Sequence, residues 1–122
     1  MLVKTSELTP SQLNYAVGSI ENPEWTPEDL WFNTIGFVYS GDPEDEPYCP
    51  SIEWGYGGPI IEREGITVGP HTTSPFIAHY GPTTTTYPFA DRSVGPTPLV
   101  AAMRCFVATE LGEVVDIPEE LL

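Results

Sequence analysis

The chain has 122 residues, and hydrophobic residues make up 40% of them, which is enough for one core in a single domain spanning residues 1–122. Eighteen acidic residues against four basic ones give a formal net charge of −14. Such a charge repels nucleic-acid backbones and anionic lipids, so we expect no direct binding to nucleic acids or membranes. The 14 aromatic residues argue against a disordered chain.

The sequence carries no signal for secretion, membrane insertion or metal binding. Its N-terminus lacks an apolar signal region, and no apolar run could span a bilayer. We therefore expect a cytoplasmic protein in which Cys49 and Cys105 stay reduced, without the spacing of a metal site. His71 and His79 are expected to be ordinary hydrogen-bonded histidines. We expect no cofactor.

Two N-terminal helices are predicted from paired Thr-Pro signals. The first covers residues 5–20, where Thr9 is the N-cap and Pro10 occupies the first helical position. The second covers residues 26–35, where Thr26 also precedes a proline. Apolar residues recur at helical spacing in the first segment, so one face should be buried.

The central region is predicted to be rich in loops and short antiparallel strands. Residues 41–47 carry four carboxylates and two prolines, without the glycine and final Glu of an EF-hand, so we expect a solvated loop. Four Gly-Pro pairs then punctuate residues 48–95. The β-prone runs between them are residues 59–63, 65–68, 76–80 and the polar run 83–86.

The strongest helix signal covers residues 97–111, with Thr97 as N-cap and Gly112 as the closing residue. This segment is apolar nearly all round, which predicts a buried helix. Its small side could pack on a helix of the same chain or on a symmetric partner, and is formed by Ala101, Cys105 and Ala108. A closing strand follows at residues 113–117.

These elements predict a small single-domain α+β fold. It has N-terminal helices, a central loop-rich antiparallel β region, one long buried C-terminal helix and a closing strand. We find no phosphate-binding loop, nucleophile elbow or zinc-hydrolase motif. We therefore expect no catalytic residues; an enzyme such as a small phosphodiesterase would depend on the histidines and carboxylates alone.

An aromatic and glycine-rich loop is predicted before the strand at residues 59–63. It contains Trp54, Tyr56, Gly57 and Gly58. Such a loop can stack a planar ligand, because glycine allows close approach and the aromatic rings offer flat faces. The alternative is a hairpin turn with Trp54 packed in the core.

Two arginines complete the set of candidate ligand-binding residues. In the predicted strand, Arg63 lies on the same face as Ile61 and needs either an internal carboxylate or a bound anion as its partner. We favour the internal carboxylate. Arg104 lies at the margin of the apolar face of the C-terminal helix.

Several segments resemble the NinX-like family of bacteriophage proteins: residues 4–9, 57–66, 95–105 and 112–121. The resemblance implies a small accessory product of tailed phages, without established catalytic residues. Proteins of this origin often act in host takeover or counter-defence, which is an analogy and not chemistry.

Two functions are compatible with this sequence. The first is sequestration of a small nucleotide-like host signal, with Trp54 and Tyr56 stacking its base and Arg63 and Arg104 holding its phosphate, in a homo-oligomer packed through residues 97–111. The alternative is an acidic inhibitor, possibly a nucleic-acid mimic, of a host defence or DNA-processing enzyme. We favour the first.

Overall fold

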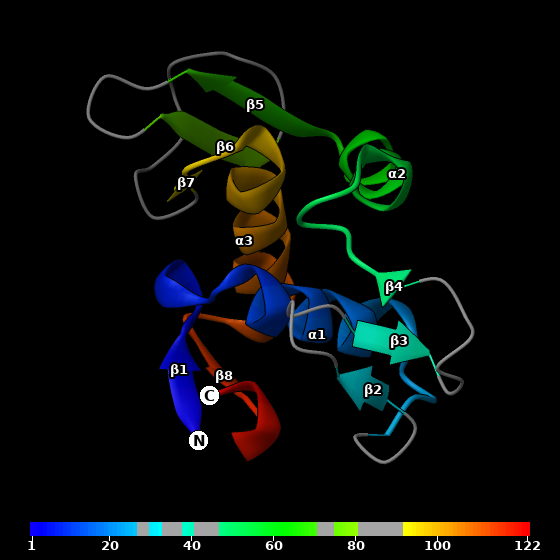
Figure 1. The fold of residues 1–122 in the computed structure, drawn as a ribbon. Coiled ribbons are helices and arrows are strands. Elements are labelled where there is room, and N and C mark those ends of the chain that lie inside the picture. The colour runs from blue at the N-terminus through cyan, green and yellow to red at the C-terminus, as the bar shows by residue number, and fades with distance from the viewer. Residues whose placement is uncertain (27–29, 33–37, 41–46, 71–74, 81–91) are drawn as a thin grey trace.

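The computed structural model describes residues 1–26, 30–32, 38–40, 47–70, 75–80 and 92–122. Within them the α+β fold is confirmed (Figure 1). The elements are, in chain order, β1 (Leu2–Lys4), η1 (Thr5–Glu7), α1 (Pro10–Glu21), β2 (Leu30–Phe32), β3 (Val38–Ser40), β4 (Pro47–Tyr48), α2 (Trp54–Glu64), β5 (Ile66–Pro70), β6 (Phe76–Tyr80), β7 (Arg92–Gly95), α3 (Pro98–Leu111), β8 (Val114–Asp116) and η4 (Glu119–Leu121).

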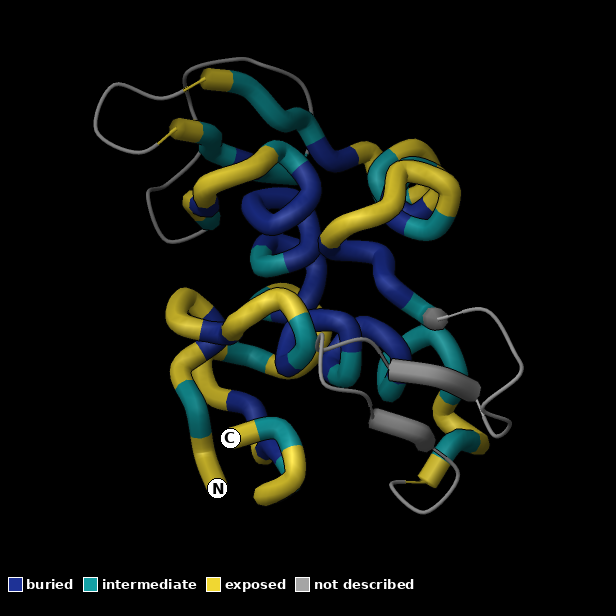
Figure 2. Tube along the Cα trace, viewed as in Figure 1, coloured by how far each residue is buried: buried dark blue, intermediate teal, exposed yellow. Residues whose placement is uncertain are grey.

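Helix α3 is the centre of the fold and confirms the predicted C-terminal helix. It begins after Thr97, whose side chain accepts a hydrogen bond from the Val100 N–H at 3.1 Å, and it ends at Gly112. In Figure 1 it runs between the β5-β6-β7 sheet and α1, and Figure 2 shows it buried along most of its length. An apolar helix needs this kind of cover on all sides.

The small side of α3 is used inside the chain. Ala101 is fully buried and Cys105 is 2% exposed, with α1, α2 and the β5-β6-β7 sheet packed around the helix. Packing within the chain thus covers Ala101 and Cys105, whereas Ala108 is only partly buried. A homo-oligomer through residues 97–111 stays a prediction.

The described strands form three antiparallel sheets, with orders β1-β8, β2-β3-β4 and β5-β6-β7. The predicted strands at residues 65–68, 76–80 and 113–117 are confirmed as β5, β6 and β8. In the two-stranded sheet, Lys4 pairs with Val114 and places the start of the chain beside its end. Strand β7, which the sequence did not predict, pairs with β6 and lies along α3.

The first predicted helix is confirmed, with a later start. Residues Thr5–Glu7 form the separate turn η1, and α1 begins at Pro10 after a capping box. In this box the Thr9 side chain accepts a hydrogen bond from the Gln12 N–H, and the Gln12 side chain accepts one from the Thr9 N–H. The proline fits the first turn because that position needs no N–H donor.

The second predicted helix, residues 26–35, is wrong where the structure describes it. Leu30–Phe32 is strand β2, paired with Val38–Ser40. A Leu-Trp-Phe run suits a strand as well as a helix, and pairing with β3 decides between them. The polar run 83–86, His71 and the acidic loop apart from Pro47 in β4 lie outside the described residues.

The predicted loop at Trp54–Gly58 and strand at residues 59–63 are also wrong, because Trp54–Glu64 is helix α2. Three glycines and the internal Pro59 disfavour a helix. Packing overrides them: a Cβ on Gly57 would lie 2.4 Å from the Pro50 carbonyl oxygen, so only glycine lets α2 approach so closely. The helix ends at Gly65, which has a left-handed φ of 68°.

Candidate functional site

Five of the six predicted ligand-binding residues lie together on α2, and Arg104 lies apart from them on α3. Trp54 is 57% exposed at the start of α2. The Tyr56 ring instead packs edge-on against Tyr48, with ring centroids 5.5 Å apart. Gly57 is buried against Pro50, and a methyl group added at Gly58 would be in ordinary contact with the Trp54 ring. Their binding of a ligand remains a prediction.

Arg63 has the internal carboxylate partner that we favoured. Its guanidinium donates hydrogen bonds to both carboxylate oxygens of Glu21, one at 2.8 Å, and to Glu64 at 3.0 Å. These bonds raise the pKa of Arg63 above its ordinary value. The side chain is half exposed and lies over the Phe106 ring, so it is part of the surface of α2 and not of a buried strand.

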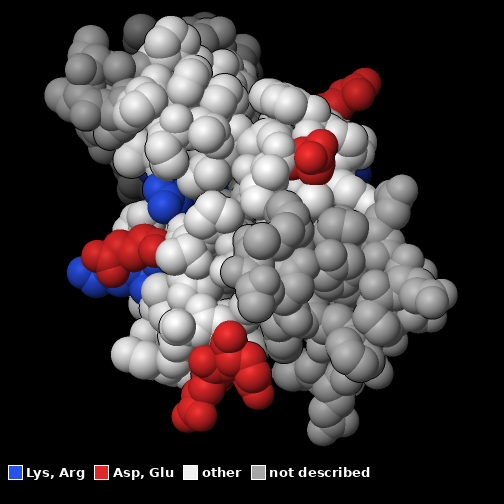
Figure 3. Space-filling view, viewed as in Figure 1, with Lys and Arg blue, Asp and Glu red and all other residues white. Residues whose placement is uncertain are grey.

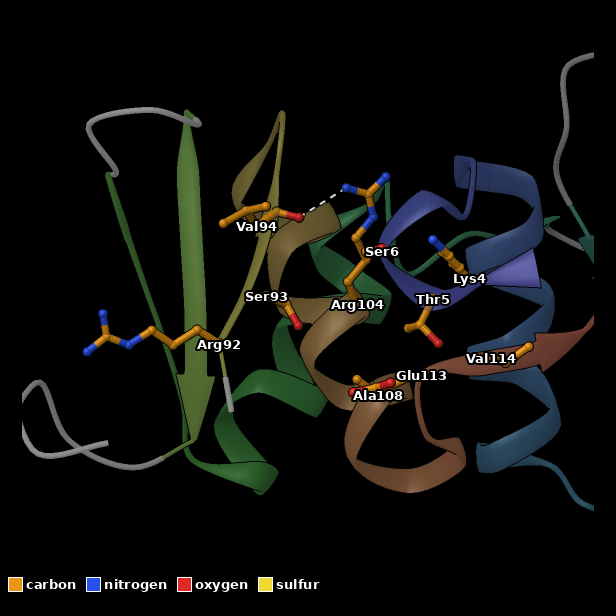
Figure 4. Close-up of a pocket in the computed structure, with 10 residues that line it drawn as sticks. All are labelled: Lys4, Thr5, Ser6, Arg92, Ser93, Val94, Arg104, Ala108, Glu113 and Val114. Carbon is orange, nitrogen blue, oxygen red and sulfur yellow. Dashed lines mark hydrogen bonds between the residues drawn. The ribbon is translucent and has the colours of Figure 1, made fainter. Parts of the chain in front are cut away.

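A cavity of about 430 Å³ opens on another part of α3. Four segments build its walls: the end of β1 with η1, strand β7, the middle of α3, and the start of β8 (Figure 4). Its lining residues are Lys4, Thr5, Ser6, Arg92, Ser93, Val94, Arg104, Ala108, Glu113 and Val114. We call it the basic cavity.

Charge distinguishes this cavity from the rest of the molecule. Lys4, Arg92 and Arg104 are three of the four basic residues in the whole sequence, and the described lining contains one carboxylate, Glu113. The described lining residues thus carry a formal charge of +2 in a chain of −14. Figure 3 shows basic surface gathered at the left edge of the visible face, beside a group of acidic atoms. A concave site of one sign focuses the electrostatic field and attracts the opposite charge.

Arg104 holds two walls of the cavity together. Its Nη1 donates to the Val94 carbonyl and its Nη2 to the Leu8 carbonyl, both at 3.0 Å. Within the described part of the chain, its buried Nε–H has no hydrogen-bond acceptor. Burial lowers the pKa of Arg104, and among the described residues no carboxylate pairs with it. The described contacts of this guanidinium are therefore neutral carbonyl groups.

Lys4 and the hydroxyl groups complete the cavity. Figure 4 shows the Lys4 amine directed toward Ser6 and Arg104, whereas the Arg92 guanidinium points away from them, so Arg92 acts at longer range. Thr5 anchors the wall: its hydroxyl donates to the Gly112 carbonyl at 2.7 Å. Its N–H donates to the Glu113 carbonyl at 2.8 Å.

Lys4 and Arg92 were not predicted as site residues. The scarcity of basic residues could have identified them, because a chain with only four such residues makes each one a candidate for a specific role. Their proximity could not be read from the sequence, because it requires the β1–β8 pairing and the position of β7 beside α3.

A family model described as "Bacteriophage P22, NinX" matches residues 4–110, which is most of the chain. The chain belongs to this NinX family. The match includes all four basic residues. It also covers the two walls of the basic cavity that Arg104 bridges, which are the N-terminal segment with η1 and strand β7. A search of curated proteins gave no match.

The described residues of this NinX-family chain hold neither a metal-type cluster nor a helix that could cross a bilayer. They contain no group of three or more His, Cys, Asp or Glu residues suited to a metal ion. None of their helices has the length and apolar character that a membrane span requires. Cys49 and Cys105 are buried and are not joined in a disulfide. His79 places Nδ1 3.1 Å from the Tyr80 carbonyl.

A second cavity, of about 340 Å³, lies at the first turn of α3. Its lining is mostly apolar and includes Trp54, one of the residues predicted from the sequence. The lining residues are Pro10, Ser51, Ile52, Trp54, Pro96, Thr97, Pro98, Leu99 and Val100. We call it the apolar cavity. In this NinX-family chain, the exposed Trp54 thus lines the same cavity as the first turn of α3.

Proposed function

We propose that this NinX-family protein is a non-enzymatic phage accessory factor that acts in the cytoplasm of the infected host. It binds and sequesters a small, anionic, nucleotide-like host signal in the basic cavity. One observation carries the proposal: three of the four basic residues of an acidic chain line a single cavity.

The local chemistry supports an anionic ligand. Arg104 is partly desolvated and its described partners are neutral carbonyl groups, so an incoming phosphate would gain a charge-assisted hydrogen bond. Lys4 is exposed at the cavity and can add a second contact. The cavity volume is in the range of small-molecule sites.

The lining also supports binding without catalysis. Among the described residues, the lining contains neither histidine nor cysteine, and Glu113 is the one carboxylate. Phosphodiester hydrolysis requires a base or metal-activated water together with stabilisation of the developing charge. The basic side chains supply only the second of these functions, which suits a protein that holds its ligand unchanged.

The net charge favours a second candidate, the acidic inhibitor of a host enzyme. A charge of −14 attracts basic protein surfaces and gives binding that weakens as salt rises. In this function the basic cavity has no role. The first proposal therefore requires Lys4 and Arg104 for binding, whereas the second does not.

The experiment is a calorimetric titration of the purified protein with nucleoside monophosphates, cyclic dinucleotides and ADP-ribose. At least one probe should bind, and Lys4→Gln should weaken it by about tenfold, which corresponds to ~1.4 kcal/mol for one lost charged contact. Arg63→Gln is the matched control, because it removes the same charge at a site outside the cavity.

Each result has a definite meaning. Loss of affinity in Lys4→Gln with no change in Arg63→Gln supports the basic cavity. The reverse pattern would move the site to α2. If no probe binds, sequestration of these signals is rejected, and a salt-sensitive pull-down of host proteins tests the inhibitor.

A further inference from the structure

The basic cavity and the apolar cavity share three segments of the chain. Each of these segments lines both cavities, with residues two to four positions apart. The pairs are Ser6 and Pro10 in the N-terminal segment, Val94 and Pro96 after β7, and Arg104 and Val100 on α3. Val100 and Arg104 are one helical turn apart, a rise of about 6 Å.

Arg104 lies at the boundary between the two cavities. Its guanidinium joins the carbonyl of Val94 on one wall to that of Leu8 on the other. Both carbonyls come from residues just before the prolines that line the apolar cavity, Pro96 and Pro10. Both cavities thus lie beside the first three turns of α3, with Val100 lining one and Arg104 the other, and we refer to them together as the groove.

The apolar end of the groove is unsuited to an anion, although it lies at a helix N-terminus. Pro98 has no N–H, and the N–H groups of Val100 and Ala101 donate to the side chain and backbone of Thr97. Few donors remain in the first turn of α3. Trp54 and Ile52 are 57% and 42% exposed beside it, which provides a flat apolar surface.

We propose that the groove binds a nucleoside phosphate in two parts, with the phosphate at Lys4 and Arg104 and the base on the Trp54 indole. This inference rests on the proposed function and adds the ligand class and the second half of the site. The ribose would join the two parts of the ligand past Arg104, since Val100 and Arg104, which line the two cavities, are only one helical turn apart on α3. In this proposal Trp54 takes the stacking role predicted from the sequence and Arg104 the predicted phosphate contact, while Lys4 replaces Arg63.

The test compares a nucleotide with the same phosphate lacking its base. Calorimetric titrations use the four 5′-nucleoside monophosphates and ribose 5-phosphate against the wild type, Trp54→Ala and Lys4→Gln. The tightest nucleotide should bind about tenfold more strongly than ribose 5-phosphate, as expected for one stacked base. Trp54→Ala should abolish this difference and leave ribose 5-phosphate binding unchanged. Lys4→Gln should weaken both ligands.

Trp54→Phe is the matched control, because it keeps an aromatic face and should retain part of the difference. Equal affinities for nucleotide and ribose 5-phosphate, unaffected by Trp54→Ala, would overturn the two-part groove and leave the phosphate site standing. Binding of neither ligand would overturn the two-part groove, and a null result with the cyclic dinucleotides and ADP-ribose as well would overturn the proposed function. Circular dichroism spectra of all variants establish that each is folded.

Discussion

Arg63 and Glu21 form a bidentate ion pair that joins the last turn of α2 to the last residue of α1. The Arg63 side chain is 50% exposed, so water screens the pair and its contribution to stability should be small. We predict that Arg63→Ala lowers the free energy of unfolding by about 0.5–1 kcal/mol, including lost packing on Phe106. Urea denaturation measures this change.

A double-mutant cycle isolates the ion pair itself. Glu21→Ala and the double variant, measured in the same way, should give a coupling energy of roughly 0.2–1 kcal/mol that decreases at 0.5 M salt. A coupling energy well above this range would mean that the pair is protected from solvent in solution.

Gly57 and Gly55 offer a matched test of helix packing in α2. We predict that Gly57→Ala destabilises the protein by about 2–3 kcal/mol, because the new methyl group would collide with the Pro50 carbonyl and Leu99. Gly55 is on the same helix, and a methyl group added there would meet no atom within 4 Å. Gly55→Ala should therefore be neutral or stabilise by up to about 1 kcal/mol. Equal effects in urea denaturation would contradict this packing argument.

The elements with local signals could be predicted from the sequence. α1 and α3 begin at Thr-Pro pairs, and capping chemistry is a property of adjacent residues. The β5, β6 and β8 strands are β-prone runs bounded by turn residues. Helix α2 could not be predicted in this way, since its glycines and Pro59 oppose a helix until Gly57 meets Pro50.

The residues of the candidate site also divide into those with a local sequence signal and those without one. Trp54 and Arg104 were recognisable as an unusual aromatic residue near glycines and an arginine on an apolar helix. Lys4 joins the site only through β1 and its pairing with β8, more than 100 residues later in the chain. Contacts of this kind depend on the whole fold, so a single sequence does not show them.

The buried hydrogen bonds of Asn14 should be among the most important polar contacts. Asn14 is fully buried, and its Oδ1 accepts from the Ser51 N–H at 2.9 Å and the Ser51 hydroxyl at 2.7 Å. We predict that Asn14→Ala costs about 2–4 kcal/mol of stability, because both donors lose their shared acceptor. Ser51→Ala keeps the backbone bond and should cost about 1 kcal/mol. Urea denaturation of both variants would disprove this order if Ser51→Ala were the more destabilised.

Tyr80 should make the protein less stable at alkaline pH. Burial, followed by the nearby charge of Glu64, raises the pKa of Tyr80 to about 12 from its ordinary value of 10.0. Between these values the unfolded chain loses the phenol proton and the folded chain keeps it, so the free energy of unfolding falls as pH rises. Below pH 10 both states are protonated and Tyr80 gives no pH dependence.

Tyr80→Phe tests this account, because phenylalanine keeps the ring and removes the titrating group. We predict that the variant loses less stability than the wild type between pH 9.5 and 11.5, measured by urea denaturation at each pH. Some alkaline loss should remain in the variant, since burial also raises the pKa values of Tyr15 and Tyr48. Parallel pH profiles for the two proteins would show that Tyr80 titrates alike in the folded and unfolded states, and would contradict the effect of its partial burial against the core.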